Sequence, residues 1–98
     1  MYSTVLEKLR EAIRTGAYDL THHAVEEMAE DDLGIADIEC AVVGGTIVRK
    51  EFDDLRGPKY VVTGVAVDGV TKVGVVCRFK ETGTMLIITV YEISETER

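Results

Sequence analysis

The first half of the chain has the hydrophobic spacing of amphipathic helices. Apolar residues recur every three or four positions in three segments, each bounded by residues that begin or end helices. Gly16 stops the first segment, Thr21 is placed to cap the second, and Gly44-Gly45 ends the third. The predicted helices span residues 4–15, 22–31 and 35–43.

Beyond the third predicted helix, the pattern changes to the alternation of apolar and polar residues that is typical of strands. Four such segments follow, and Asp68-Gly69 and Thr82-Gly83 indicate two-residue hairpin turns between the last three. The predicted strands span residues 46–52, 59–67, 71–80 and 84–93. This order predicts a single α+β domain, with two to three N-terminal helices packed on one face of a four-stranded antiparallel meander sheet.

Two tight turns would fix the register of the sheet, and the register sorts the side chains between two faces. It pairs Val62 with Val75 and Cys77 with Ile88, on an almost wholly apolar face that should carry the helices. The opposite face mixes apolar residues with cations and hydroxyl groups, and it could hold RNA, a peptide or a partner subunit. The residues predicted on this second face are Val61, Thr63, Val65, Lys72, Gly74, Val76, Arg78, Lys80, Met85, Ile87, Thr89 and Tyr91.

Charge is unevenly distributed along the chain, whose formal net charge is −7. Between Glu26 and Glu39 there are seven acids and no Lys or Arg, whereas residues 49–80 contain seven bases and four acids. Surfaces that bind nucleic acids are usually basic, because they neutralise phosphates. An anion-binding surface is therefore expected only in the second half of the chain.

The sequence has no sign of export or of a membrane span. The N-terminus lacks the apolar region of a secretory signal, and no apolar run approaches the roughly 20 residues that cross a bilayer. Cys40 and Cys77 stand in apolar surroundings without metal-type spacing, and we expect two buried, unpaired thiols. These features predict a cytoplasmic protein.

The only two histidines, His22 and His23, are adjacent at the start of the second predicted helix. Neighbouring side chains on a helix diverge by about 100°, so the pair cannot easily share one metal ion, and we predict neither a metal site nor a cofactor. His23 is interpreted as a partly buried histidine that fixes the helix start to the sheet. A general acid or base role is the alternative, because the unperturbed pKa of histidine suits it.

The order of short motifs resembles a known family. A helix that opens with Thr-x-His-Ala and continues to Met, an acid and Asp-Ile, with a final Ile-Thr-Val-Tyr strand, is similar to the uncharacterised domain family 4258. That family is grouped with the RelE-like superfamily of small bacterial toxins. The matching residues, within about 18–93, are Thr21, His23, Ala24, Met28, Glu30, Leu33, Asp37, Ile38, Ile88, Thr89, Val90 and Tyr91.

The resemblance implies a RelE-like fold and metal-independent cleavage of RNA by basic and phenolic side chains on the sheet. The residues that it implicates are Arg78, Tyr91 and Lys80, with His23 as a further proton carrier. The implied partners are RNA and an antitoxin-type protein.

The sequence departs from the family pattern at two positions on the second predicted helix. Glu27 and Asp31 stand where the family usually has Arg, and this exchange replaces two cations by two anions that repel phosphate. The exchange favours an alternative function on the same fold, a non-catalytic module for protein contact or for homodimer formation through the sheet face. Retention of Arg78 and Tyr91 favours the enzyme, so both functions stay open.

Overall fold

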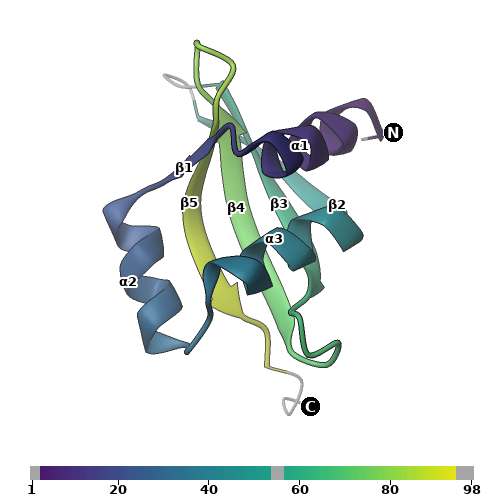
Figure 1. Ribbon diagram of the computed structural model, residues 1–98. Helices are drawn as coiled ribbons and strands as arrows, with labels where there is room; N and C mark the ends of the chain where they lie inside the picture. The colour runs from purple at the N-terminus through teal and green to yellow at the C-terminus, as the bar shows by residue number, and fades with distance from the viewer. Residues whose placement is uncertain (1–2, 54–56, 95–98) are drawn as a thin grey trace.

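The computed structural model describes residues 3–53 and 57–94, which form three helices and a five-stranded sheet (Figure 1). The helices are α1 (Ser3–Thr15), α2 (His22–Glu30) and α3 (Ile35–Gly44). The strands are β1 (Tyr18–Leu20), β2 (Thr46–Asp53), β3 (Gly57–Val65), β4 (Lys72–Phe79) and β5 (Met85–Glu92). Within the described part of the chain, no helix has the length and apolar character needed to cross a membrane.

The α+β class and the three helices are confirmed, but the four-stranded, fully antiparallel sheet is wrong. The sheet has the order β1-β5-β4-β3-β2, and β1 pairs with β5 in parallel. Three residues are too few to show a strand period, and the parallel partner lies more than 60 positions away in the sequence. Two helices, α1 and α3, cover one face of the sheet, within the predicted two to three (Figure 1). The third helix, α2, lies along the β5 side of the sheet instead.

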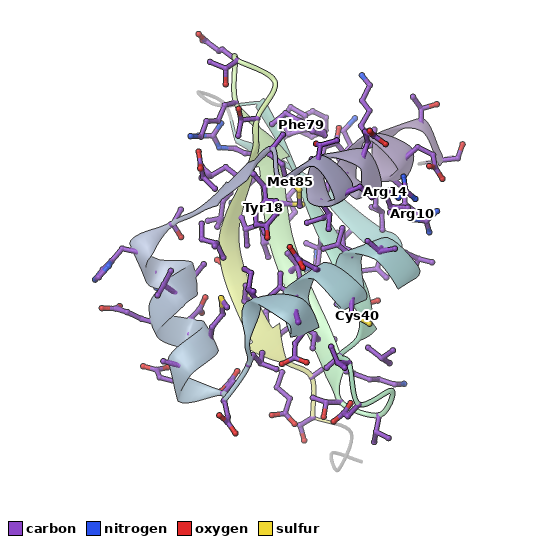
Figure 2. The ribbon with its side chains drawn as sticks, in the orientation of Figure 1. Arg10, Arg14, Tyr18, Cys40, Phe79 and Met85 are labelled. Carbon is purple, nitrogen blue, oxygen red and sulfur yellow. The ribbon has the colours of Figure 1, made fainter. Side chains whose placement is uncertain are left out.

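The core fills the layer between α1, α3 and the sheet. Its fully buried side chains come from all three parts and include Leu9, Ile38, Val62 and Ile87. Cys77 belongs to this core, and burial raises the pKa of its thiol to about 12. Cys40 is also a free thiol, as expected, but it is exposed on α3 rather than buried (Figure 2).

The predicted register is confirmed between β3 and β4 and only partly confirmed between β4 and β5. Val62 pairs with Val75, as predicted, whereas Cys77 pairs with Ile87 and not with the predicted Ile88. The second turn has three residues, however, because Lys80 accepts from Gly83 N and donates to Thr84 O. Gly83 adopts φ 92°, the conformation that this type of turn requires of its last residue.

A β-bulge compensates for the longer turn and changes the face of part of β5. The register shifts by one residue between the pairs Val76–Thr89 and Cys77–Ile87. Met85 and Ile87, predicted on the face away from the helices, therefore point into the core and are fully buried. A two-residue turn would have kept them on the other face, so the turn length is the physical source of this error.

The outer side of β5 is closed by the chain from Ala17 to Asp31 rather than by a full strand. The main chain of β1 pairs with residues 85–87, and Thr21 Oγ1 donates to Ile88 O at 2.9 Å. Beyond this point, α2 supplies side chains. Glu27 Oε1 accepts from Val90 N at 2.9 Å, and Asp31 Oδ2 accepts from Glu92 N at 3.0 Å. Two carboxylates thus take the place of a neighbouring strand.

Tyr18 ties β1 to α3 across the core layer (Figure 2). Its hydroxyl donates to Glu39 Oε2 at 2.5 Å. Burial first, and then the hydrogen bond and charge of Glu39, raise the pKa of Tyr18 from 10.0 to about 12. The neutral phenol is therefore the form that the fold selects.

Substitution of Glu27 tests the closure of β5. Glu27→Ala leaves Val90 N–H without its acceptor and should lower the free energy of unfolding by about 1–3 kcal/mol. Glu27→Gln should lose less, because its amide oxygen can still accept. Glu26→Ala is the matched control: among the described residues Glu26 pairs only with exposed His22, and its loss should change stability by less than about 0.5 kcal/mol. Equal losses for the Glu26 and Glu27 variants in chemical denaturation would contradict this role.

Gly64 on β3 and Gly44 at the end of α3 test the close packing of α3 on β3. A Cβ on Gly64 would lie 2.1 Å from Ala41 O, whereas a Cβ on Gly44 would meet nothing within 4 Å. Gly64→Ala should therefore destabilise the fold by about 1–3 kcal/mol or more, because α3 must move away from the sheet. Gly44→Ala should leave the melting temperature unchanged or slightly raised. A melting temperature of Gly64→Ala equal to wild type would show that the helix does not approach so closely.

The raised pKa of Tyr18 should make the free energy of unfolding depend on pH in the alkaline range. Its pKa is higher in the folded chain than the ordinary 10.0, so the stabilisation is complete below pH 10 and is lost as the pH rises through about 12. The free energy of unfolding should fall more steeply in this window for wild type than for Tyr18→Phe. Denaturant titrations of both proteins between pH 8 and about pH 11.5 measure the difference. Parallel curves would contradict it.

Candidate functional site: the helix-free face of the sheet

One face of the sheet carries no helix in the described part of the chain (Figure 1). Cross-strand partners share a face, so the residues that alternate with the core positions of β2–β5 lie on this side. We call it the helix-free face. It comprises Thr46, Arg49, Glu51, Lys59, Val61, Thr63, Val65, Lys72, Gly74, Val76, Arg78, Leu86, Thr89 and Tyr91.

The register arranges the helix-free face in rows that run across the strands. The first row is Thr46, Thr63, Gly74 and Tyr91, and the second is Arg49, Val61, Val76 and Thr89. The third contains Glu51 and Lys59 on one side and Arg78 and Leu86 on the other. Successive rows are two residues apart along a strand, which is about 6.6 Å.

The centre of the helix-free face is apolar but is not an open hydrophobic patch. Val61 is only 1% exposed, and its register neighbours are Arg49 and Val76. Val65, near the end of β3, is 38% exposed, and Val48, the inserted residue of β2, is 52% exposed. A surface of this kind suits a polar ligand better than an apolar protein interface.

Tyr91 lies directly over Gly74, its cross-strand partner. A Cβ on Gly74 would stand 2.2 Å from Cζ of the Tyr91 ring, 2.5 Å from Cε2 and 2.6 Å from the hydroxyl oxygen. The ring thus occupies the space that any side chain at position 74 would fill. Glycine in the interior of a strand often marks such a close approach.

Arg49 belongs to this face because of a second bulge, on β2. The register shifts between Ile47 and Arg49, so Ile47 pairs with the core residue Val62 whereas Arg49 pairs with Val61. Arg49 Nε donates to Glu51 Oε2 at 2.8 Å, and this bond is the main cause of the raised pKa of Arg49. Tyr91 contributes to the same shift, which places the phenol within electrostatic reach of Arg49.

Sequence reasoning did not single out Arg49. The face of β2 cannot be assigned by alternation when one residue, Val48, is inserted in the strand. The signal that was available is composition, because Arg49 opens the basic half of the chain.

Arg78 lies on the helix-free face with Tyr91, as predicted, but two rows away. Arg78 pairs with Leu86, and Tyr91 pairs with Gly74, four positions from Arg78 along β4, which is about 13 Å at the backbone. The guanidinium of Arg78 turns toward its own strand end, where Nη1 contacts Phe79 O at 3.5 Å. Arg78 and Tyr91 therefore share the face without being direct neighbours.

Lys80 and His23 lie outside these rows, and each is paired with a carboxylate. Lys80 follows the end of β4, and its Nζ contacts Asp19 Oδ2 at 2.7 Å. His23 is on α2, with its side chain 64% exposed and Nε2 at 3.2 Å from Glu27 Oε2. The partly buried histidine expected from the sequence is therefore replaced by an exposed one.

The charges on the helix-free face are mostly positive, in contrast to the acidic α2 and α3. The face carries Arg49, Lys59, Lys72 and Arg78 against the single acid Glu51, whose pKa is lowered by its hydrogen bond with Arg49. Among residues 3–53 and 57–94, no three His, Cys, Asp or Glu side chains are grouped to hold a metal ion. Because its charges are mostly positive, the helix-free face is suited to bind an anion through cations and hydroxyl groups.

Comparison with known proteins identifies the family of the chain. The model of a family described as a domain of unknown function, DUF4258, matches residues 20–92, which run from the last residue of β1 to the last residue of β5. Searches of curated proteins and of solved structures returned no match. Because the family model covers most of the chain, this protein belongs to the DUF4258 family.

Proposed function

We propose that this domain binds RNA on its helix-free face and cleaves it there without a metal ion, in the manner of the RelE-like toxin superfamily that its sequence resembles. The observation that carries the proposal is the concentration of four cations on one face of a protein whose formal net charge is −7. An RNA backbone is attracted to such a face and is repelled by the acidic helices.

The proposed cleavage begins when a ribose 2′-hydroxyl attacks the adjacent phosphate. The P–O5′ bond breaks, the 2′-hydroxyl loses its proton, and the leaving 5′-oxygen gains one, which yields a 2′,3′-cyclic phosphate and a 5′-hydroxyl. Arg49 would stabilise the negative charge on the phosphate oxygens, and Arg78 would join it when its guanidinium turns from Phe79 O toward Tyr91. Tyr91 would transfer a proton, because it is the phenol on this face and lies within electrostatic reach of Arg49.

Lys80 and His23, the other proton carriers implied by the resemblance, are less well placed in this proposal. Both lie outside the rows of the helix-free face and hold the carboxylates of Asp19 and Glu27. An antitoxin-type partner would be expected to cover the same face with acidic side chains, since it must compete with phosphate.

Glu27 and Asp31 favour a second candidate function, a non-catalytic protein-interaction or self-association module. Their carboxylates hold the backbone of β5, so the two cations that the family usually has at these positions are replaced by structural anions. In this alternative, the helix-free face binds an acidic protein or a second copy and cuts no RNA. The low exposure of Val61 favours a charged partner over an apolar self-contact.

Fluorescence anisotropy with a labelled single-stranded RNA tests the proposed binding. Arg49→Ala and Arg78→Ala should each weaken binding and reduce the slope of log affinity against log salt by about 0.7, the value for one lost phosphate contact with a single strand. Arg14→Ala is the matched control, because Arg14 is exposed on α1 (Figure 2) and pairs with Glu11 on the same helix. Absence of binding at 50 mM salt, or an equal loss for Arg14→Ala, would overturn the proposal.

An RNA-integrity assay in EDTA separates the enzyme from the non-catalytic module. The enzyme should produce 2′,3′-cyclic phosphate ends, and Arg78→Ala should reduce the rate by about 10²–10³-fold, as when one stabilising donor is removed. RNA that is bound but stays intact would assign the face to the alternative function.

A further inference from the structure

We infer that the ring of Tyr91, seated on Gly74, is a stacking platform for an unpaired nucleobase, so that the RNA bound by this face is single-stranded. This inference rests on the proposed RNA binding and goes beyond it, because it gives the ring of Tyr91 a role separate from that of its hydroxyl.

The ring of Tyr91 lies against the strand backbone at Gly74. Three atoms at the hydroxyl end of Tyr91 lie within 2.6 Å of the point where a Cβ on Gly74 would stand, so the ring packs on the strand backbone instead of projecting from the sheet. Tyr91 is partly exposed, and no helix covers this side of the sheet in the described part of the chain. The ring face that points away from Gly74 is therefore available to a planar ligand.

The side chains that continue the row of Tyr91 and Gly74 are small. Thr63 and Thr46 continue the same row beyond Gly74, so no large side chain covers the ring from that direction. A hollow of about 320 Å³ lies beside this row and is lined by Thr63, Val65, Lys72 and Ile93. Its mixture of apolar and polar groups suits a base and its ribose.

The ring of Tyr91 lies on the same face of the sheet as two arginines. Arg78 stands two rows from Tyr91 on the adjacent strand β4, and Arg49 stands one row away on β2, beyond β4 and β3. A strand of RNA whose base stacks on Tyr91 would run its phosphates past both arginines. Only an unpaired base can do this, because bases inside a duplex already stack on each other and present no free face to a flat sheet.

Binding of a labelled heptameric oligoadenosine by variants of Tyr91 tests the inference. Tyr91→Phe keeps the ring and should bind within about twofold of wild type, whereas Tyr91→Leu should lose about 5- to 150-fold, the range for one stacked base. The same oligonucleotide with abasic sites should bind wild type more weakly by a similar factor and should not distinguish the Leu variant from wild type. Circular dichroism and thermal melting check that each variant is folded.

Gly74→Ala gives an independent test, because its methyl group would displace the ring without altering the ring itself. It should weaken binding of the intact oligonucleotide more than that of the abasic one.

Should Tyr91→Leu bind like wild type, or should Tyr91→Phe bind as weakly as Tyr91→Leu, the platform is refuted while RNA binding by the arginines stands. Failure of wild type to bind any RNA refutes the proposed function and this inference together. Loss of cleavage alone in Tyr91→Phe supports the platform, because the hydroxyl and the ring would then act separately.

Discussion

The way in which the outer side of β5 is closed determines most of what the fold presents to solvent. The first part of β5 pairs with β1, and the last part donates its N–H groups to the carboxylates of Glu27 and Asp31. The bulge of β5 lies where one kind of partner gives way to the other, beside the hydrogen bond from Thr21 to Ile88 O. The three-residue turn sends Met85 and Ile87 into the core, and the bulge returns Thr89 and Tyr91 to the helix-free face.

This closure also explains how an acidic protein can keep a basic surface. Glu27 of α2 and Asp31 at its C-cap are needed as acceptors at the edge of the sheet, so their charges lie beside β5 instead of among the cations. The bases of the second half of the chain fall on β2, β3 and β4, where alternation brings four of them to one side. Because the sheet separates the acidic side chains from the basic ones, the electrostatic potential at the helix-free face can be positive although the net charge of the protein is negative.

The sequence predicted those parts of the structure that depend on local chemistry. Helix spacing with Gly16, Thr21 and Gly45 at the boundaries located three helices, and Asp68-Gly69 predicted the register of β3 with β4. Arg78 and Tyr91 were correctly placed on one face, because β4 was in register and Tyr91 lies beyond the bulge of β5.

The parts that failed depend on single inserted residues and on distant partners. The extra residues in β2 and β5 cannot be located from alternation, because a bulge changes the face without changing the composition. Arg49 was therefore not selected, and Met85 and Ile87 were placed on the wrong side. The roles of Glu27 and Asp31 were also hidden, since their acceptor contacts join segments more than 60 residues apart.

The measurement that tests the central claim most directly is the change in backbone amide chemical shifts of the labelled protein when a short single-stranded RNA is added. The account predicts that the largest changes fall in Arg49, Val61, Gly74, Val76 and Tyr91, with little change in α1 and α3. Changes confined to the helices, or no saturable change at low salt, would contradict the assignment of the helix-free face as the ligand surface.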